Sequence, residues 1–280
     1  MKNNSAFTLI EIAIVLTIIG LIIGGIFTAQ NLIRNTQLQS VIKDVDRYKK
    51  AVQLFKEKYG ELPGDMPTAT NFWGIDTGCV ASPLSDATVA NAIPKTATCN
   101  GNGDRSIGDS TGTALGNATN GRESFRMWQQ LADAGFIDGS YTGAFSNRAP
   151  QTDPGMNTPL SKITGSTFLL LHVQPPSPLL IPAGEFDANY RHIIVFGAPS
   201  KLSNNAVNGP IPPYYPSLTA SEAFSIDQKM DDGYPGTGNI LSYTPGLLAT
   251  PNCATSATPP AAYKVSTSGN VCSLIFITGF

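Results

Sequence analysis

The sequence predicts an α+β protein: a long N-terminal helix, whose first half is transmembrane, packs on a small antiparallel sheet with long disulfide-bounded loops. Three observations lead to this fold. An apolar run near the N-terminus passes into a stripe of helical period, three short runs of bulky apolar residues lie in the second half, and four cysteines stand in segments rich in Gly, Ser, Thr and Pro. With 280 residues the chain is long enough for an anchor and one large domain.

The first element is a helix of 53 residues, from Phe7 to Tyr59. Residues 12–29 are apolar apart from two threonines, and the 18 residues rise about 27 Å as a helix, close to the ~30 Å hydrocarbon core of a bilayer. A cleaved signal peptide is the alternative. The best cut for it, after Ala29, would place the bulky Phe27 where a small residue is needed.

The second half of this helix is amphipathic. Apolar residues follow one another at steps of three and four, which marks a single helix face. They are Leu38, Val41, Val45, Tyr48, Val52, Phe55 and Tyr59. Gly60 and Pro63 then end the helix. We expect the first half to lie in lipid or in a helix bundle, and the second half to pack against a sheet.

The cysteines form two pairs that are close in sequence, Cys79 with Cys99 and Cys253 with Cys272. Neither pair has CxxC spacing, and no clustered histidines accompany them as at a zinc site. Three pairings are possible. We favour the local one, in which each bridge would stabilise the fold by about 3 kcal/mol. Such bridges need an oxidising compartment, whereas free thiols would be typical of the cytosol.

Residues 60–121 are a loop-rich stretch that carries the first cysteine pair. The segment 122–136 then predicts a short amphipathic helix that Gly135 ends. Its apolar face consists of Phe125, Trp128, Leu131 and Ala132. We interpret Trp128 as a core anchor of the folded head rather than as a platform for a ligand.

Three strands are predicted at 167–173, 191–198 and 273–280, where short apolar runs are rich in bulky or β-branched residues. Proline-rich connections separate them and are unsuited to central strands. We expect these strands to form the antiparallel sheet that rests on the second half of the long helix.

One acid, Glu11, stands inside the stretch NNSAFTLIEIAIVLTIIG. A carboxylate deep in a membrane helix costs about 2.5–3.5 kcal/mol unless it is paired. The string FTLIE, which follows the polar leader MKNNSA and opens a long apolar helix, resembles the N-terminus of type IV prepilins and type II secretion pseudopilins. The resemblance covers about 25 residues of the chain.

The resemblance implies processing and assembly. A prepilin peptidase cuts such chains before the phenylalanine, here between Ala6 and Phe7, and methylates the new amine. The family usually has Gly before the cut, so Ala6 leads us to expect slower or less complete cleavage. The resemblance assigns Glu11 to filament entry. On a helix the new amine of Phe7 would share a face with Glu11, so the acid can pair with its own chain or with a neighbour.

The resemblance also implies the domain organisation: a leader over residues 1–6, a transmembrane half over 7–29, an amphipathic half over 30–59 and a periplasmic or extracellular head over 60–280. Its expected partners are prepilin peptidase, other pilin-like subunits bound through the N-terminal helix, an inner-membrane assembly platform and membrane lipid. The chain would reside in the bacterial inner membrane as a single-pass protein and then join a periplasmic or cell-surface filament.

A large head favours a minor or tip subunit of such a filament. The alternative from another class is a membrane-anchored periplasmic binding protein or adhesin whose N-terminus only resembles a prepilin. An enzyme is not expected, because the sequence has none of the common catalytic or nucleotide-binding motifs and both histidines fall in apolar strands. Nucleic acid is not indicated as a partner either, because the formal net charge is -2.

No cofactor is established by the sequence, and calcium is the one that we consider. Thr219 and Glu222 form the pattern of a capping box, and Gly233 can close the helix that they begin. Three acids, Asp227, Asp231 and Asp232, then gather at its C-terminus, where the helix dipole disfavours them. Either a calcium ion or backbone N–H groups of the next turn would explain them, and capping is the favoured explanation.

A second calcium candidate lies at residues 99–110. Asn100, Asn102 and Asp104 alternate as oxygen ligands do in a calcium loop. Arg105 stands where an EF-hand needs Gly, and Thr111 replaces its final Glu. A turn bounded by the disulfide is therefore the favoured interpretation.

Overall fold

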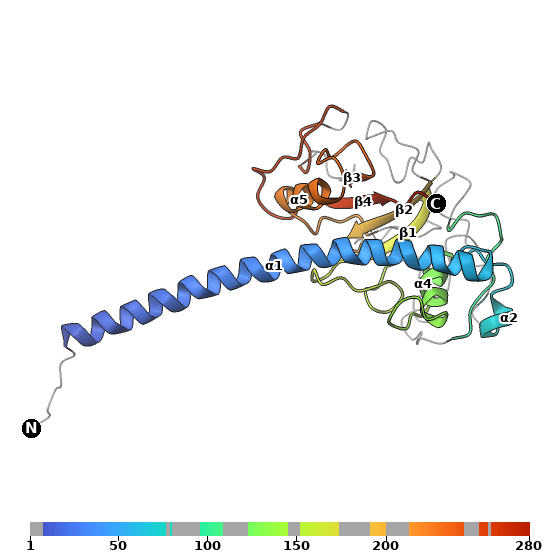
Figure 1. Ribbon diagram of the computed structural model, residues 1–280, viewed down its shortest axis with the longest axis horizontal. Coiled ribbons are helices and arrows are strands. Elements are labelled where there is room, and N and C mark those ends of the chain that lie inside the picture. The colour runs from blue at the N-terminus through green and yellow to red at the C-terminus, as the bar shows by residue number, and fades with distance from the viewer. Residues whose placement is uncertain are drawn as a thin grey trace, which may run out of the picture.

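The computed structural model describes residues 8–76, 79, 96–108, 123–144, 152–173, 191–199, 213–243, 252–256 and 259–280. Its elements are α1 (Leu9–Tyr59), α2 (Thr70–Trp73), α4 (Glu123–Asp133), β1 (Thr167–Val173), β2 (Arg191–Gly197), α5 (Ala220–Met230), β3 (Ile240–Tyr243) and β4 (Ser273–Ile277). Figure 1 shows the first half of α1 projecting from a head that is built around its second half. The α+β class and the long N-terminal helix are confirmed.

Helix α1 has 51 residues, and its ends follow from local chemistry. Thr8 is the N-cap, so the helix begins at Leu9 rather than at Phe7, which lies outside the described residues. Gly60 ends it with a φ of 79°, a left-handed conformation that costs glycine little, and its N–H donates to the carbonyl of Lys56. The predicted apolar stripe is buried from Leu38 to Phe55, whereas Tyr59 is only partly buried.

Among the described residues, four antiparallel strands form one sheet in the order β1-β2-β4-β3. The structure has β1 at the predicted bounds, β2 one residue shorter than predicted and β4 only as far as Ile277. Sequence reasoning missed β3, because its four residues follow a Pro-Gly-Thr-Gly turn and are too few to establish a period. The strand is defined by its pairing with β4, in which Ile240 lies opposite Phe276, and this pairing cannot be seen in the local sequence.

Both faces of the sheet are apolar, which explains why its strands read as continuous apolar runs. One face packs in the main core with the stripe of α1, and its residues are Phe168, Leu170, Ile194, Phe196, Leu274 and Phe276. Trp128 is fully buried in this core and meets the ring of Tyr48 edge-on with ring centroids 4.9 Å apart. The interpretation of Trp128 as a core anchor is therefore confirmed.

The predicted short helix is present as α4, and every residue from Glu123 to Leu131 is buried, the polar ones included. The polar side is covered because the loops at 64–66 and 97–108 fold over it and use its side chains as hydrogen-bond partners. Helical period alone could not reveal this cover, since the loops lie far away in sequence.

Both disulfides have the local pairing. Cys79 is bonded to Cys99 and Cys253 to Cys272, with Cα atoms 5.5 Å and 5.1 Å apart. The second bridge joins Cys253 to Cys272, the residue just before β4, and the first joins two cysteines that follow α2 in the sequence.

Candidate functional site

The first candidate site is the N-terminal end of α1, where Glu11 and Thr8 form a capping box. The Oε2 atom of Glu11 accepts hydrogen bonds from the backbone N–H and from the Oγ1 hydroxyl of Thr8, both at 2.8 Å. In return the Glu11 N–H donates to Thr8 Oγ1 at 3.3 Å. The carboxylate is thus oriented by its own chain, and two of its four lone-pair sites stay available for another donor. The predicted cleavage residues, Ala6 and Phe7, lie outside the described residues.

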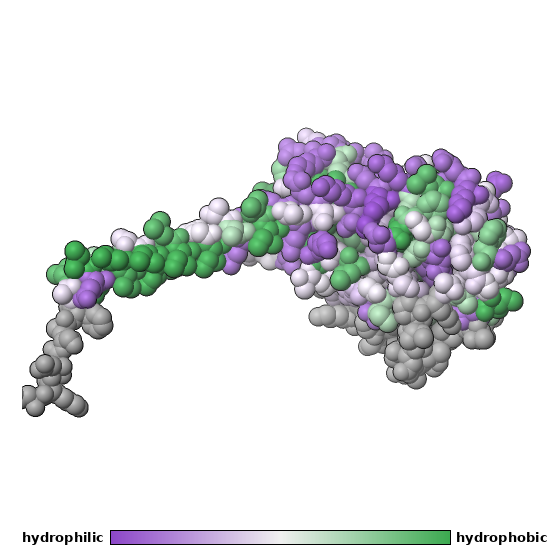
Figure 2. Space-filling model, turned by 60° about the horizontal axis from the view of Figure 1, so that its bottom comes forward, coloured by the Kyte–Doolittle hydropathy of each residue, from purple (hydrophilic) through white to green (hydrophobic). Residues whose placement is uncertain are grey.

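The arm that begins at this site, Leu9–Ile33, is mostly apolar. Its Leu, Ile, Val and Phe side chains are between 45% and 88% exposed, and Figure 2 shows the arm green over most of its length. Helix α1 is long and apolar enough to cross a membrane, and none of its most apolar 18-residue window is buried by the part of the chain that the structure describes. So much exposed apolar surface is stable only in lipid or against other helices.

A bidentate ion pair joins the arm to the head. Arg34 Nε donates to Glu222 Oε1 at 2.6 Å, and Arg34 Nη2 donates to Glu222 Oε2 at 2.9 Å. Glu222 is also the acid of the capping box that begins α5, where it accepts from the Thr219 N–H at 2.9 Å. Partial burial favours the neutral form of Glu222, but the hydrogen bonds from Arg34 outweigh it and lower the pKa of the carboxyl. The capping box is confirmed, and its acid has an ion-pair partner in α1, 188 residues away in the sequence.

At the C-terminus of α5 the three predicted acids come together, and each has protein donors. Asp227 is buried and accepts from the Gly233 N–H at 3.0 Å and from the Tyr263 hydroxyl at 2.6 Å. Burial raises the pKa of Asp227 to about 6. Asp232 accepts from the Tyr234 N–H at 2.8 Å and from a threonine hydroxyl. Asp231 accepts from two backbone N–H groups at the start of β3.

One carboxylate oxygen from each of these acids lies within 4.8 Å of the others, so the set could hold a cation. The donors nevertheless supply the alternative explanation that the sequence offered, backbone N–H groups of the following turn. Helix α5 ends at Met230, and Gly233 stands three residues beyond it with a φ of 77°. The calcium assignment stays a prediction.

The second candidate loop is organised around an acid that sequence reasoning did not select. The carboxylate of Asp65 accepts from the backbone N–H groups of Gly103, Asp104 and Arg105 at 2.7 Å, 3.1 Å and 2.8 Å. Asp65 is fully buried, and this burial raises its pKa to about 6. Gly101 lies so close to the Asp65 backbone that a Cβ atom would sit 2.2 Å from its carbonyl carbon.

The predicted ligands of that loop bond to the protein instead of converging on one point. Asn100 Oδ1 accepts from the Thr70 N–H at 2.8 Å, and Asn102 Oδ1 accepts from the Asp104 N–H at 2.9 Å. Asp104 in turn accepts from the Ser106 N–H at 2.8 Å and from the Asn102 amide at 2.9 Å. This arrangement favours the turn interpretation, and metal binding here stays a prediction.

Glu123, the first residue of α4, is the second buried acid that was missed. It accepts from the N–H groups of Asn102 and Gly108, both at 3.1 Å, and so holds both ends of the loop. Burial raises its pKa to about 9. The only sequence signal for it was an acid in the first turn of a helix, which is common without any such role.

Both histidines lie in strands, as expected. In β2, His192 is 4% exposed; its Nε2 atom accepts from the Ile107 N–H at 3.1 Å, so Nδ1 carries the proton and donates to the Phe280 carbonyl at 2.8 Å. Burial lowers the pKa of His192 to about 4. This neutral, doubly bonded ring links the 96–108 loop to the end of the chain.

Comparison with known proteins identifies the N-terminal segment. Residues 1–27 match the prokaryotic N-terminal methylation motif, the signature of prepilins and pseudopilins. The motif supports a subunit of the type IV pilin or pseudopilin kind, and the apolar arm suits a membrane-anchored pilin. No curated protein and no solved structure matches the chain. The match ends at residue 27, before the head begins.

Proposed function

We propose that this chain is a minor or tip subunit of a type IV pilus-like or type II secretion pseudopilus-like filament. In this proposal prepilin peptidase cuts between Ala6 and Phe7 and methylates the new amine. The subunit then stays in the bacterial inner membrane with its head in the periplasm until its arm enters the filament. The observation that carries the proposal is the conjunction of the methylation motif with an apolar arm that the head leaves uncovered.

The geometry at Thr8 supports a docking role for Glu11. In the single chain both donors of Thr8 satisfy the carboxylate, so the acid is tolerated before assembly. Since lone pairs of the carboxylate remain available, a neighbour's ammonium group can bind it without breaking the capping box. A charge-assisted bond of that kind is about twice as strong as a neutral one, which favours docking at a matching height.

The processing step is tested by the mass of the mature protein. We expect an N-terminus at Phe7 carrying one methyl group in cells with the peptidase, and an N-terminus at Met1 in cells without it. Ala6→Gly should increase the processed fraction, because it restores the residue that the family usually has before the cut. An N-terminus at Met1 in cells with an active peptidase would contradict the proposal.

The assembly step is tested with Glu11→Ala. We expect the variant to remain in the membrane fraction while its share in isolated filaments falls by about tenfold or more, because a neighbour's ammonium then lacks a partner in an apolar environment. Glu57→Ala is the matched control, since Glu57 is an exposed acid on the same helix beyond the apolar arm. Equal incorporation of both variants would remove Glu11 from the assembly step.

The same experiments separate this proposal from a membrane-anchored binding protein. A filament subunit depends on the peptidase for release from the membrane, whereas an anchored binding protein should be indifferent to its deletion. The large head, roughly residues 60–280, favours a minor or tip position because it leaves little room for repetition along a shaft. Counting subunits per filament by quantitative mass spectrometry tests that position.

A further inference from the structure

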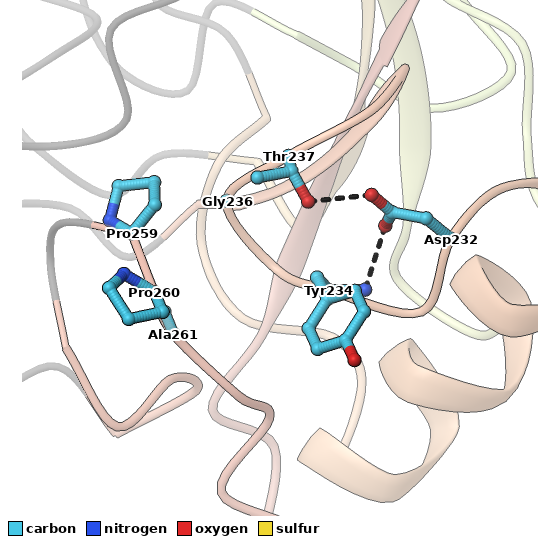
Figure 3. A pocket seen from close by; sticks show the side chains of 7 residues that line it. All are labelled: Asp232, Tyr234, Gly236, Thr237, Pro259, Pro260 and Ala261. Atoms are coloured by element: carbon cyan, nitrogen blue, oxygen red, sulfur yellow. Dashed lines mark hydrogen bonds between the residues drawn. The ribbon is translucent and has the colours of Figure 1, made fainter.

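The head carries a pocket of about 560 Å³ beyond the C-terminal end of α5. Tyr234, Thr237 and Asp232 line one side, and Pro259 with Pro260 lines the other. Figure 3 shows the two proline rings on one side of the loop that carries Tyr234. The Tyr234 side belongs to the turn between α5 and β3, and the proline side to the segment between the two cysteines of the second disulfide.

Side-chain hydrogen bonds fix the turn that carries Tyr234, although Tyr234 itself is exposed. Tyr234 is 57% exposed, yet its N–H is bonded to Asp232, whose other oxygen accepts from Thr237 Oγ1 at 2.6 Å. At the end of the turn Asp231 accepts from the N–H groups of Asn239 and Ile240. The backbone that carries the exposed Tyr234 ring is therefore fixed before any ligand arrives, which is a feature of binding sites.

The opposite wall is fixed to the same base. Its segment is closed by the Cys253–Cys272 bridge and by the pairing of Ala254 with Tyr263. Asp227 then joins the two walls, since its carboxylate accepts from the Gly233 N–H on one side and from the Tyr263 hydroxyl on the other. The two segments that carry Tyr234 and the prolines are therefore held to the same buried carboxylate.

We propose that this pocket binds a neutral saccharide, with a sugar ring between the phenol of Tyr234 and the prolines. The flat phenol ring of Tyr234 matches the C–H face of a pyranose, and the prolines offer an apolar wall opposite it. The pocket volume falls in the range of small-molecule sites. At the rim, the carboxylate of Asp232 has lone pairs beyond the two hydrogen bonds that it accepts. The hydroxyl oxygen of Thr237, whose proton is donated to Asp232, can itself accept a further hydrogen bond. Sugar hydroxyls are the donors that fit this edge.

The charge of the pocket narrows the ligand class. None of the described residues that line it is basic, and Asp231 and Asp227 lie close to the carboxylate of Asp232. Phosphates, sulfates and acidic sugars would be repelled by these carboxylates. The inference concerns the head alone and does not depend on entry of the chain into a filament.

The test uses the full chain in phospholipid nanodiscs, so that no glycoside detergent competes. The probes are cellobiose, lactose and N,N′-diacetylchitobiose, followed by saturation-transfer difference NMR. We expect transfer to the ring protons of at least one disaccharide, with affinity at least about fivefold weaker in Tyr234→Ala and nearly unchanged in Tyr234→Phe. Phe72→Ala is the matched control, because Phe72 is also 57% exposed but lies in α2, outside the pocket.

The proposal is overturned if none of the three disaccharides receives saturation, or if transfer is the same in Tyr234→Ala as in the parent chain. Binding of tetramethylammonium in place of the sugars would equally overturn it in favour of a cation site. Should Tyr234→Ala lose its thermal transition, Asp232→Asn takes its place and should weaken the same signal by removing acceptor sites from the rim.

Discussion

At the scale of the residue, His192 shows how a buried titratable group couples stability to pH. The folded chain holds the ring neutral, because a protonated ring could no longer accept from the Ile107 N–H. Its pKa falls from about 6.5 to about 4 on folding. Between these pH values His192 is protonated in the unfolded chain but not in the folded chain. The free energy of unfolding therefore falls as the pH falls.

We predict that His192→Gln makes the free energy of unfolding depend less steeply on pH between pH 6.5 and pH 4, the range that we call the acid limb. The parent chain should lose about 3 kcal/mol through this residue between pH 6.5 and pH 4, while the variant, which cannot titrate, should lose correspondingly less. Chemical denaturation at a series of pH values measures the difference between the two curves. That difference is the informative quantity, because Asp65, Glu123 and Asp227 have raised pKa values and change stability in the opposite direction.

His172→Gln is the matched control for this experiment. His172 faces His192 across the β1–β2 pair, with ring centroids 5.0 Å apart, and is less buried. The control should keep the steep acid limb. Parallel curves for the parent chain and His192→Gln would show that the proton is not excluded at this ring.

At the scale of the element, α4 acts as a hub: its side chains form the hydrogen bonds that hold the loops around it. Glu123 holds residues 102 and 108, Gln129 bonds the Ala97 carbonyl, and Gln130 bonds both Gly64 and Cys99. Arg126 makes a buried ion pair with Asp76 at 2.9 Å. A single buried helix therefore fixes loops that come from three parts of the chain.

Gln130→Leu tests this role. The change leaves the Gly64 N–H without the acceptor that it has at 2.6 Å, and a buried unsatisfied donor costs about 1–3 kcal/mol. We expect the denaturation midpoint to fall accordingly and amide exchange at residues 64 and 97–101 to accelerate. Gln228→Leu, the same change on an exposed position of α5, should be nearly neutral. Equal effects in both variants would contradict the hub.

The acids at the end of α5 give a second prediction at this scale. Because each of the three carboxylates already accepts hydrogen bonds from the protein, millimolar calcium should leave the thermal midpoint unchanged within about 1 °C. Differential scanning calorimetry with calcium and with a chelator measures this. A rise of several degrees that Asp232→Asn abolishes would instead establish a calcium site.

At the scale of the whole molecule, one ion pair marks where the apolar arm ends and the head begins. Arg34 reaches Glu222 with two hydrogen bonds and also approaches the Ser217 carbonyl at 3.4 Å. The side chains are 32% and 17% exposed, so solvent screens the pair only in part. The direction of the head relative to the arm is thereby tied to the first turn of α5.

A double-mutant cycle with Arg34→Ala and Glu222→Gln measures the interaction energy of this ion pair. We expect a coupling energy of about 1 kcal/mol in denaturation, above the usual value for exposed pairs because the geometry is bidentate. Amide exchange at Thr219–Ser221 should rise in both single variants. Arg47→Ala, which removes a more exposed arginine that pairs with Asp44 and Asp138, is the control and should not affect α5. Additive effects of the two changes would show that the pair does not join arm and head.

What could be predicted from the sequence was whatever rests on local spacing. The period of α1, its stop at Gly60, the three apolar strands, the Thr219–Glu222 capping box and the nearest-neighbour disulfides all follow from residues close together in the chain. The methylation motif is local in the same sense, since it occupies residues 1–27. Short-range hydrogen bonding and helical geometry determine the helical features among these, while the strands and the disulfides only carry local signals in the sequence.

The tertiary structure decided the rest. The short strand β3 forms because its backbone pairs with that of β4. Asp65 and Glu123 anchor a loop because folding brings N–H groups that are distant in sequence within hydrogen-bond distance of their buried carboxylates. The Tyr234 pocket has walls from two separate segments of the chain, joined through Asp227. The sequence by itself determined the helix, the core stripe and the signature of the arm. Only long-range packing decided which polar groups would be buried together, because the free energy that holds them depends on partners that local spacing does not reveal.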